Sequence, residues 1–180
     1  MKSGVLLYGG FGGFEANLEE RNIARYPTIL SGDLNGDDSG LTNNAENSNH
    51  VVVGANSARI DGFTITGGNA DSTSTTGGGV YCYETAPTVV DCIIKYNNAS
   101  LRGGGLYCFN AAPLIKNCVF WGNNSASVGG GIGLWTSTAS IINCSFNGNT
   151  AAYGGGISNQ SSASRDRKST RLNSSHGKLS

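Results

Sequence analysis

The sequence has little charge, little proline and no long apolar run. Charged residues make up 13% of the 180 residues, and there are 3 prolines against 28 glycines. The low charge and the lack of heptads exclude a coiled coil, and no apolar run reaches the roughly 18 residues of a membrane span. Because the formal net charge is zero, the composition gives no electrostatic reason to expect nucleic acid as a partner.

What the sequence does contain is an internal repeat. Triple glycines begin at Gly77, Gly103, Gly129 and Gly154, so the spacings are 26, 26 and 25 residues. Each unit is rich in glycine, asparagine and β-branched residues in short alternating stretches, which is typical of strands and argues against helical repeats. A propeller blade needs about 40 residues or more. A unit of this length fits one coil of a three-sided solenoid, and we predict an all-β, right-handed parallel β-helix.

Stacked coils place like residues on like residues about 4.8 Å apart. The apolar columns therefore predict a continuous core, with these side chains pointing inward: Val80, Leu106, Ile132, Cys92, Cys118, Cys144, Phe120 and Phe146. Two polar columns predict amide ladders at the corners of the coils, where asparagine also tolerates left-handed backbone: Asn97, Asn123 and Asn149, and Asp91, Asn117 and Asn143.

The domain organisation follows from the repeat. We predict one β-helix over residues 1–165, with regular coils over 77–160 and irregular coils over 1–76. Residues 9–26 and 31–49 are expected to be insertions between coils, and Glu15 to Arg21 a short helical turn.

The last fifteen residues differ abruptly in composition. Asp166 to His176 matches one reading frame of a common short-read sequencing adaptor. Such artefacts are excluded from fold reasoning, so we expect 166–180 to be a disordered tail, with a natural basic tail as the alternative. On this interpretation the natural C-terminus lies beyond the sequence.

The five cysteines fall in columns. Cys82 aligns with Cys108, and Cys92, Cys118 and Cys144 align with one another. A ladder of free, buried thiols is favoured, because free cysteine behaves as a small apolar residue. A disulfide between neighbouring coils and a metal site remain alternatives, although no Cys-x-x-Cys spacing supports zinc.

An aromatic column runs through Tyr83, Phe109 and Trp135. If Val80 and Cys82 point inward, alternation along the strand turns Tyr83 outward. Three exposed rings on successive coils would offer an extended glycan a row of apolar contacts, and the few charges nearby favour a neutral one. The alternative is that the rings pack under a loop or point inward.

Two groups of acidic residues are candidates for a metal site or for a catalytic carboxylate pair. Asp33, Asn35 and Asp37 alternate like the start of a calcium loop, although position 12 is Asn44, Glu46 is two residues further, and Asp38 stands where glycine is usual. The alternative is a solvated turn. Asp61 and Asp91 are expected at one corner of adjacent coils, where two carboxylates could serve a retaining glycosidase. Asn117 and Asn143 in that column favour a corner-forming role instead.

The motifs also resemble a known group. Gly-Gly-Gly-Val-Tyr from Gly77, Val-Asp-Cys-Ile-Ile around Cys92, and Asp-Gly-Phe-Thr-Ile-Thr-Gly-Gly from Asp61 resemble secreted bacterial right-handed parallel β-helix proteins. These include the chlamydial polymorphic outer-membrane protein repeats and the wider pectin-lyase-like superfamily. The resemblance implies a secreted or cell-surface location, and it implies that Met1 is internal to a longer protein.

The resemblance is strong for fold and weak for activity, because function lies in sites grafted on folds. The favoured expectation is a non-catalytic surface or adhesion module that binds a polysaccharide or cell-surface glycan. One alternative is a polysaccharide lyase or glycoside hydrolase of the pectin-lyase-like type, and another is a structural passenger or spacer. No cofactor is expected apart from the candidate calcium.

Overall fold

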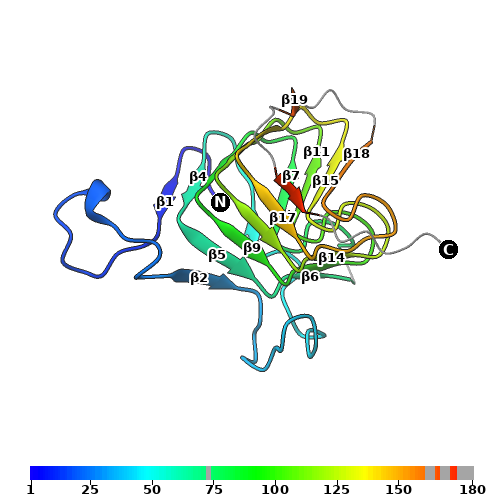
Figure 1. The fold of residues 1–180 in the computed structure, drawn as a ribbon, viewed down its shortest axis with the longest axis horizontal. Helices are drawn as coiled ribbons and strands as arrows, with labels where there is room; N and C mark the ends of the chain where they lie inside the picture. Colours follow the sequence, from blue (N-terminus) through cyan, green and yellow to red (C-terminus); the bar gives the residue numbers. More distant parts are fainter. Residues whose placement is uncertain (72–73, 161–164, 167–170, 174–180) are drawn as a thin grey trace.

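The protein is a parallel β-solenoid. The computed structural model describes residues 1–71, 74–160, 165–166 and 171–173. Within them the named strands pair in parallel, each with its equivalent in the neighbouring coil, and the repeat is about 26 residues. Figure 1 shows the coils stacked in chain order around one core. The predicted fold class is confirmed.

The strands form four stacks, which we number in the order in which a coil visits them. Sheet 1 contains β3 (Val52–Val53), β7 (Val80–Tyr83), β11 (Leu106–Phe109), β15 (Ile132–Trp135) and β18 (Ile157–Gln160). Sheet 2 contains β1 (Leu6–Tyr8), β4 (Arg59–Asp61), β8 (Thr88–Val90), β12 (Leu114–Lys116), β16 (Ser140–Ile142) and β19 (Arg165–Asp166).

Sheet 3 contains β2 (Thr28–Ser31), β5 (Phe63–Thr66), β9 (Ile93–Lys95), β13 (Val119–Trp121), β17 (Ser145–Asn147) and β20 (Arg171–Asn173). Sheet 4 is a short stack of β6 (Asn69–Ala70), β10 (Asn98–Ala99) and β14 (Asn124–Ser125).

The apolar columns form the core as predicted. All eight side chains expected to point inward are buried, with at most 2% exposure. The rings of Phe120 and Phe146 stack with centroids 5.0 Å apart, one coil on the next. Each buried apolar side chain of this size contributes about 1.5–3 kcal/mol to stability, and in-register stacking leaves few voids because each layer repeats the shape below it.

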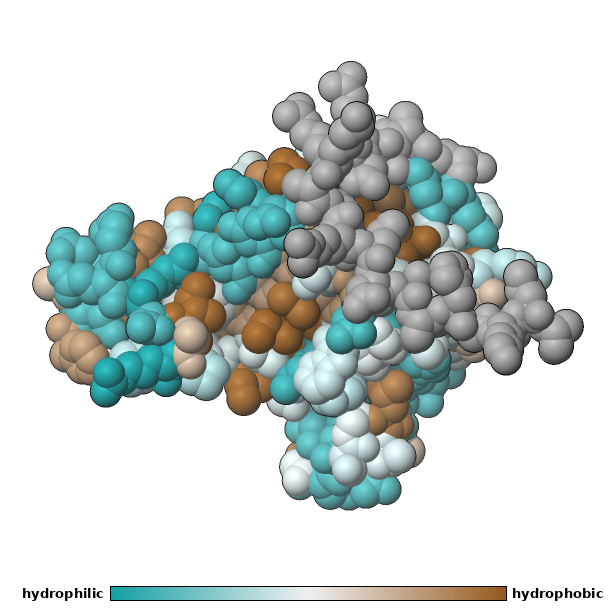
Figure 2. Space-filling view, in the orientation of Figure 1, coloured by the Kyte–Doolittle hydropathy of each residue, from teal (hydrophilic) through white to brown (hydrophobic). Residues whose placement is uncertain are grey.

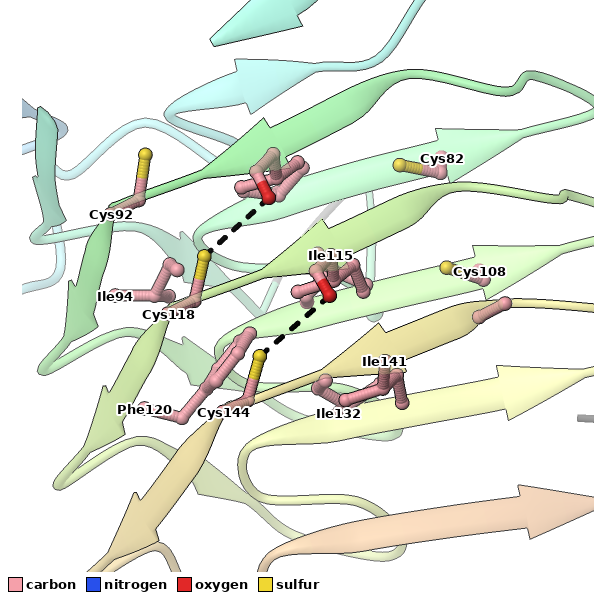
Figure 3. Close-up of a cluster of buried hydrophobic side chains, with 14 of the residues drawn as sticks. Cys82, Cys92, Ile94, Cys108, Ile115, Cys118, Phe120, Ile132, Ile141 and Cys144 are labelled. Carbon is pink, nitrogen blue, oxygen red and sulfur yellow. Dashed lines mark hydrogen bonds between the residues drawn. The ribbon is translucent and has the colours of Figure 1, made fainter. Parts of the chain in front are cut away.

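The cysteine columns are part of this core. All five thiols are free and buried, which confirms the expected thiol ladder. The thiol of Cys118 donates to the carbonyl of Val89 at 3.5 Å, and that of Cys144 donates to the carbonyl of Ile115 at 3.8 Å, in the preceding coil (Figure 3).

The asparagine columns form the predicted ladders. Asn97 and Asn123 are fully buried, and each donates through Nδ2 to Oδ1 of the asparagine in the next coil, at 3.1 Å and 2.9 Å. At the other corner Asn117 donates to Asp91 at 2.9 Å. Asp91 and Asn117 have φ near +52° and +55°, so this column also supplies the left-handed turn.

The glycine triplets are required where the chain enters sheet 1. Gly103 has φ +63°, a conformation that other residues rarely adopt. A Cβ on Gly104 would lie 2.1 Å from the carbonyl oxygen of Asn124 in the next coil. The backbones of neighbouring coils therefore approach too closely here for any side chain.

The N-terminal region departs from one expectation. β1 and β2 belong to the same first coil, so the segment between them is an insertion within a coil rather than between coils. The second insertion joins β2 to β3 and does connect successive coils. The expected helical turn is present as a short 3-10 helix, Leu18–Glu20.

The C-terminal segment is described only in part. Arg165–Asp166 pairs with β16, and Arg171–Asn173 pairs with β17. Residues 167–170 and 174–180 lie outside the described residues. The interpretation of 166–180 as an artefactual disordered tail stays a prediction.

Candidate functional sites

The outer surface of sheet 1 carries a row of aromatic rings. Tyr83 pairs in register with Phe109, and Phe109 pairs with Trp135. Tyr83 is 48% exposed, and the other two are partly exposed, while Val80 and Cys82 on the same strand are buried. The three rings therefore point outward, as strand alternation predicts.

Two further tyrosines share this surface, and the sequence reasoning did not single them out. Tyr81 and Tyr107 lie two residues before Tyr83 and Phe109, so alternation turns them to the same side. Tyr81 is partly exposed, whereas Tyr107 is covered and only 5% exposed. Their rings stack with centroids 6.2 Å apart, and His50 stacks on Tyr81 at 4.6 Å. We call the surface formed by Tyr81, Tyr83, Tyr107, Phe109 and Trp135 the aromatic face.

Tyr81, Tyr83, Tyr107 and Phe109 form a chain of stacked rings, and Trp135 lies under Arg102 instead. Tyr83 and Phe109 are nearly parallel, at 5° with centroids 5.1 Å apart. Parallel rings at this separation overlap in an offset stack, so each presents an edge and part of a face to solvent. The guanidinium of Arg102 lies 4.3 Å from the centroid of the Trp135 ring, in the range of a cation–π interaction. The surface is consequently ribbed rather than flat.

Polar groups border the aromatic face. Glu84, Asn110 and Thr136 follow its strands directly and are exposed. The Thr136 hydroxyl donates to Oδ1 of Asn110. Burial, with a smaller effect from Tyr83, raises the pKa of Tyr81, so this phenol is a neutral hydrogen-bond donor at neutral pH.

The acid pair considered from the sequence is not formed as expected. Asp61 pairs in register with Val90, so the corner position equivalent to Asp91 is Gly62. Asp61 is fully buried, and its carboxylate forms ion pairs at 2.5 Å with Arg21 and Arg59. A buried carboxylate held by two guanidinium groups is not available to a substrate. Asp61 therefore ties the first insertion to the solenoid.

A second group of polar residues lies in the loop that follows β2. Asp33, Asp37, Asp38 and Glu46 each offer a carboxylate oxygen, and these oxygens lie within 4.8 Å of one another. The candidates Asp33 and Asp37 are thus brought together, whereas Asn35 lies between them and is exposed. In the sequence, Asp38 and Glu46 counted only as departures from a calcium-loop motif. The fold places both among the converging carboxylates.

Asp33 also organises the loop itself. Its carboxylate accepts hydrogen bonds from the backbone N–H groups of Gly36, Asp37 and Asp38, at 2.7, 3.3 and 3.2 Å. Burial alone would raise the pKa of Asp33, but these N–H groups outweigh it and lower that pKa. The turn expected as the alternative to a metal site is therefore formed, by the same residue that joins the carboxylate group.

A cavity of about 290 Å³ separates this loop from the outer surface of sheet 3. Its polar lining includes Asp33 and Asp38 from the loop and Thr64, Thr66 and Lys95 from the sheet. Ile29 also lines it, and three further apolar side chains are exposed on sheet 3: Ile93, Val119 and Trp121. Figure 2 shows apolar patches over β5 and β9 in the orientation of Figure 1.

No family model, curated protein or solved structure matches this chain. The resemblance to pectin-lyase-like and chlamydial repeat proteins therefore depends on the sequence motifs, while the solenoid fold stands on the structure. Among the described residues, no helix has the length and apolar character needed to cross a membrane.

Proposed function

We propose that this solenoid is a non-catalytic, extracellular or cell-surface module that binds a neutral glycan on its aromatic face. The observation that carries the proposal is the in-register row Tyr83, Phe109 and Trp135, which points outward on three successive coils with Tyr83 exposed and the other two partly exposed. Large apolar side chains exposed in a contiguous row are characteristic of binding surfaces. The proposed location is supported by the sequence resemblance.

The spacing of the row suits an extended polymer. Rings on adjacent coils repeat at roughly the interstrand distance of about 4.8 Å, which is close to the size of one sugar ring. A glycan lying along the solenoid would place its C–H groups on the exposed ring edges and part-faces. Its hydroxyls would bond to the hydroxyls of Tyr81 and Tyr83 and to the exposed Asn110 and Thr136.

A non-catalytic role is preferred because the two carboxylates considered for hydrolysis do not occupy equivalent positions and one of them is buried. Asp61 is buried between two arginines, and Asp91 accepts a hydrogen bond from Asn117 in the corner ladder. The aromatic face is bordered by one positive group, Arg102, and one negative group, Glu84. Their charges cancel, so these two groups give no net electrostatic attraction for a polyanionic sugar. The proposal therefore favours neutral polysaccharides over polyuronates.

The test is a titration of soluble neutral polysaccharides (a β-glucan, a xylan and a mannan) and one polyuronate against the full chain by calorimetry. Trp135→Ala and Tyr83→Ala should each weaken binding of the preferred neutral glycan about 3- to 10-fold, because an aromatic contact contributes about 0.5–1.5 kcal/mol. The matched control is Trp121→Ala, which removes a 42% exposed ring from sheet 3 and should leave affinity unchanged. Binding by none of the glycans, or equal loss in Trp121→Ala, would refute the proposal.

A further inference from the structure

Among the described residues, no lysine or arginine forms an ion pair with the acidic loop after β2. Four carboxylates, from Asp33, Asp37, Asp38 and Glu46, converge within 4.8 Å. In the part of the chain that the structure describes, the two ion pairs both go to Asp61 instead. Lys95 faces the adjoining cavity, but its Nζ lies over the rings of Tyr96 and Trp121, at 5.7 and 6.0 Å from their centroids.

Buried oxygen atoms without hydrogen bonds give a second, independent observation. Oδ1 of Asp38, Oε1 of Glu46 and Oδ1 of Asn47 are shielded from solvent and accept no hydrogen bond from the described residues. Asn47 is tied to the same group, because its Nδ2 donates to Oδ2 of Asp38 at 2.7 Å. A buried acceptor left without a partner costs about 1–3 kcal/mol. Three such acceptor oxygens beside four carboxylates would be satisfied by a bound cation.

The dimensions of the group fit a calcium ion. Calcium takes six to eight oxygen ligands at about 2.3–2.6 Å, so two oxygens on opposite sides of the ion are about 5 Å apart. The observed limit of 4.8 Å between the carboxylate oxygens agrees with this value. Four carboxylates and one amide carbonyl supply six or more oxygen ligands if at least one carboxylate binds through both of its oxygens. Magnesium demands a stricter octahedron and keeps several waters, so it fits a carboxylate-rich set less well.

We propose that the loop binds one Ca²⁺ ion through Asp33, Asp37, Asp38, Glu46 and the amide oxygen of Asn47. Asp33 and Asp38 also line the cavity beside sheet 3, which gives the ion a route from solvent. The bound ion fastens the second insertion to the solenoid. Asn47 immediately precedes Ser48, whose N–H bonds to Gly32 and whose carbonyl accepts from Asn69 of β6.

Calcium chloride titrated into the EDTA-dialysed full chain tests this proposal by calorimetry. We expect one binding event per chain, with a dissociation constant below about 1 mM, the weak limit for extracellular calcium modules. Asp38→Asn and Glu46→Gln should each weaken binding at least 10-fold. Asp91→Asn is the matched control, because it removes a carboxylate outside the loop at a corner where asparagine already occurs in later coils; it should bind as the unmodified chain does.

Thermal unfolding gives a readout that does not depend on heat of binding. With about 10 mM CaCl₂, roughly ten times that limiting dissociation constant, the melting temperature of the unmodified chain and of Asp91→Asn should rise by about 3 °C or more over EDTA. The rise in the two loop variants should be smaller by about 2 °C or more. No calcium binding by the folded, unmodified chain would overturn the proposal, as would identical calcium responses in all variants. A stronger response to MgCl₂ than to CaCl₂ would overturn the assignment of the ion.

Discussion

The side chain of Asn97 donates a hydrogen bond from Nδ2 to Oδ1 of Asn123, 3.1 Å away and one coil further along the chain. Asn123 repeats the contact with Asn149 at 2.9 Å. Each amide also bonds to backbone of the preceding coil: Nδ2 of Asn97 donates to the carbonyl of Ile65, and that of Asn123 donates to the carbonyl of Ile94. One side chain thereby joins three successive coils at a corner that is buried from solvent.

Replacing the central member of this ladder should be costly. Asn123→Ala removes the side-chain oxygen that accepts from the buried N–H of Asn97, and it removes the donor to the carbonyl of Ile94. Nδ2 of Asn97 loses one acceptor but keeps the carbonyls of Ile65 and Lys95. We expect a loss of about 2–4 kcal/mol in the free energy of unfolding, measured by urea denaturation. Asn147→Ala, an exposed position on the neighbouring strand, should change stability by about 0.5 kcal/mol or less. Similar losses in both variants would contradict a specific role for the ladder.

The five cysteines should be unreactive while the protein is folded. All are buried, so a reagent in solution does not reach them. Burial, reinforced by the neighbouring Cys82, also raises the pKa of the Cys108 thiol, which makes its reactive thiolate scarce. Hydrogen bonding to Cys118 lowers the pKa of the Cys92 and Cys144 thiols, so those two are protected by burial alone. With Ellman's reagent at pH 8, less than one thiol per chain should react in an hour, and all five should react in guanidinium chloride. Asn147→Cys, which adds an exposed thiol, should give one rapid equivalent. Rapid reaction of several thiols in the native, unmodified chain would contradict the buried columns.

Asp38 should destabilise the folded protein when calcium is removed. Burial raises the pKa of its carboxyl, as do the charges of Asp33 and Asp37, while the Asn47 hydrogen bond opposes them. Because the folded state then binds the proton more tightly than the unfolded state, stability falls as pH rises from the ordinary aspartate pKa through the raised one.

The variant Asp38→Asn removes this penalty together with a calcium ligand. In EDTA at pH 7 its melting temperature should exceed that of the unmodified chain by a few degrees at most, and the difference should vanish towards pH 4. In calcium the order should reverse. A variant that melts lower than the unmodified chain in EDTA at pH 7 would show that Asp38 is not under electrostatic strain.

Much of the fold could be predicted because the repeat supplies several examples of each structural position. Val80, Leu106 and Ile132 recur at one spacing, and only stacked coils put them in contact, so inward orientation followed directly. The irregular coils over residues 1–76 do not contain such repeated copies of a position. Asp61 was aligned with Asp91, whereas the structure aligns it with Val90, because a single copy of a strand–corner–strand motif does not fix its own register.

The sites show the same division. Tyr83, Phe109 and Trp135 were found from their column and lie outward as expected, and Tyr81 and Tyr107 could have been found by the same alternation. The loop group could be recognised only in part. Asp33 and Asp37 carried a sequence pattern, but Glu46 and Asn47 join Asp38 through a turn built on backbone hydrogen bonds to Asp33.

The sequence by itself determined the coil length, the inward and outward faces of the regular strands and the ladders of cysteine and asparagine. It could do so because stacking at a fixed period converts spacing along the chain into contact in space. Only the tertiary structure decided the path of the two insertions, the burial of Asp61 between Arg21 and Arg59, and the convergence of the acidic loop on a cavity beside sheet 3. Those features depend on contacts between segments that occur once, and no periodicity constrains where such segments fold back.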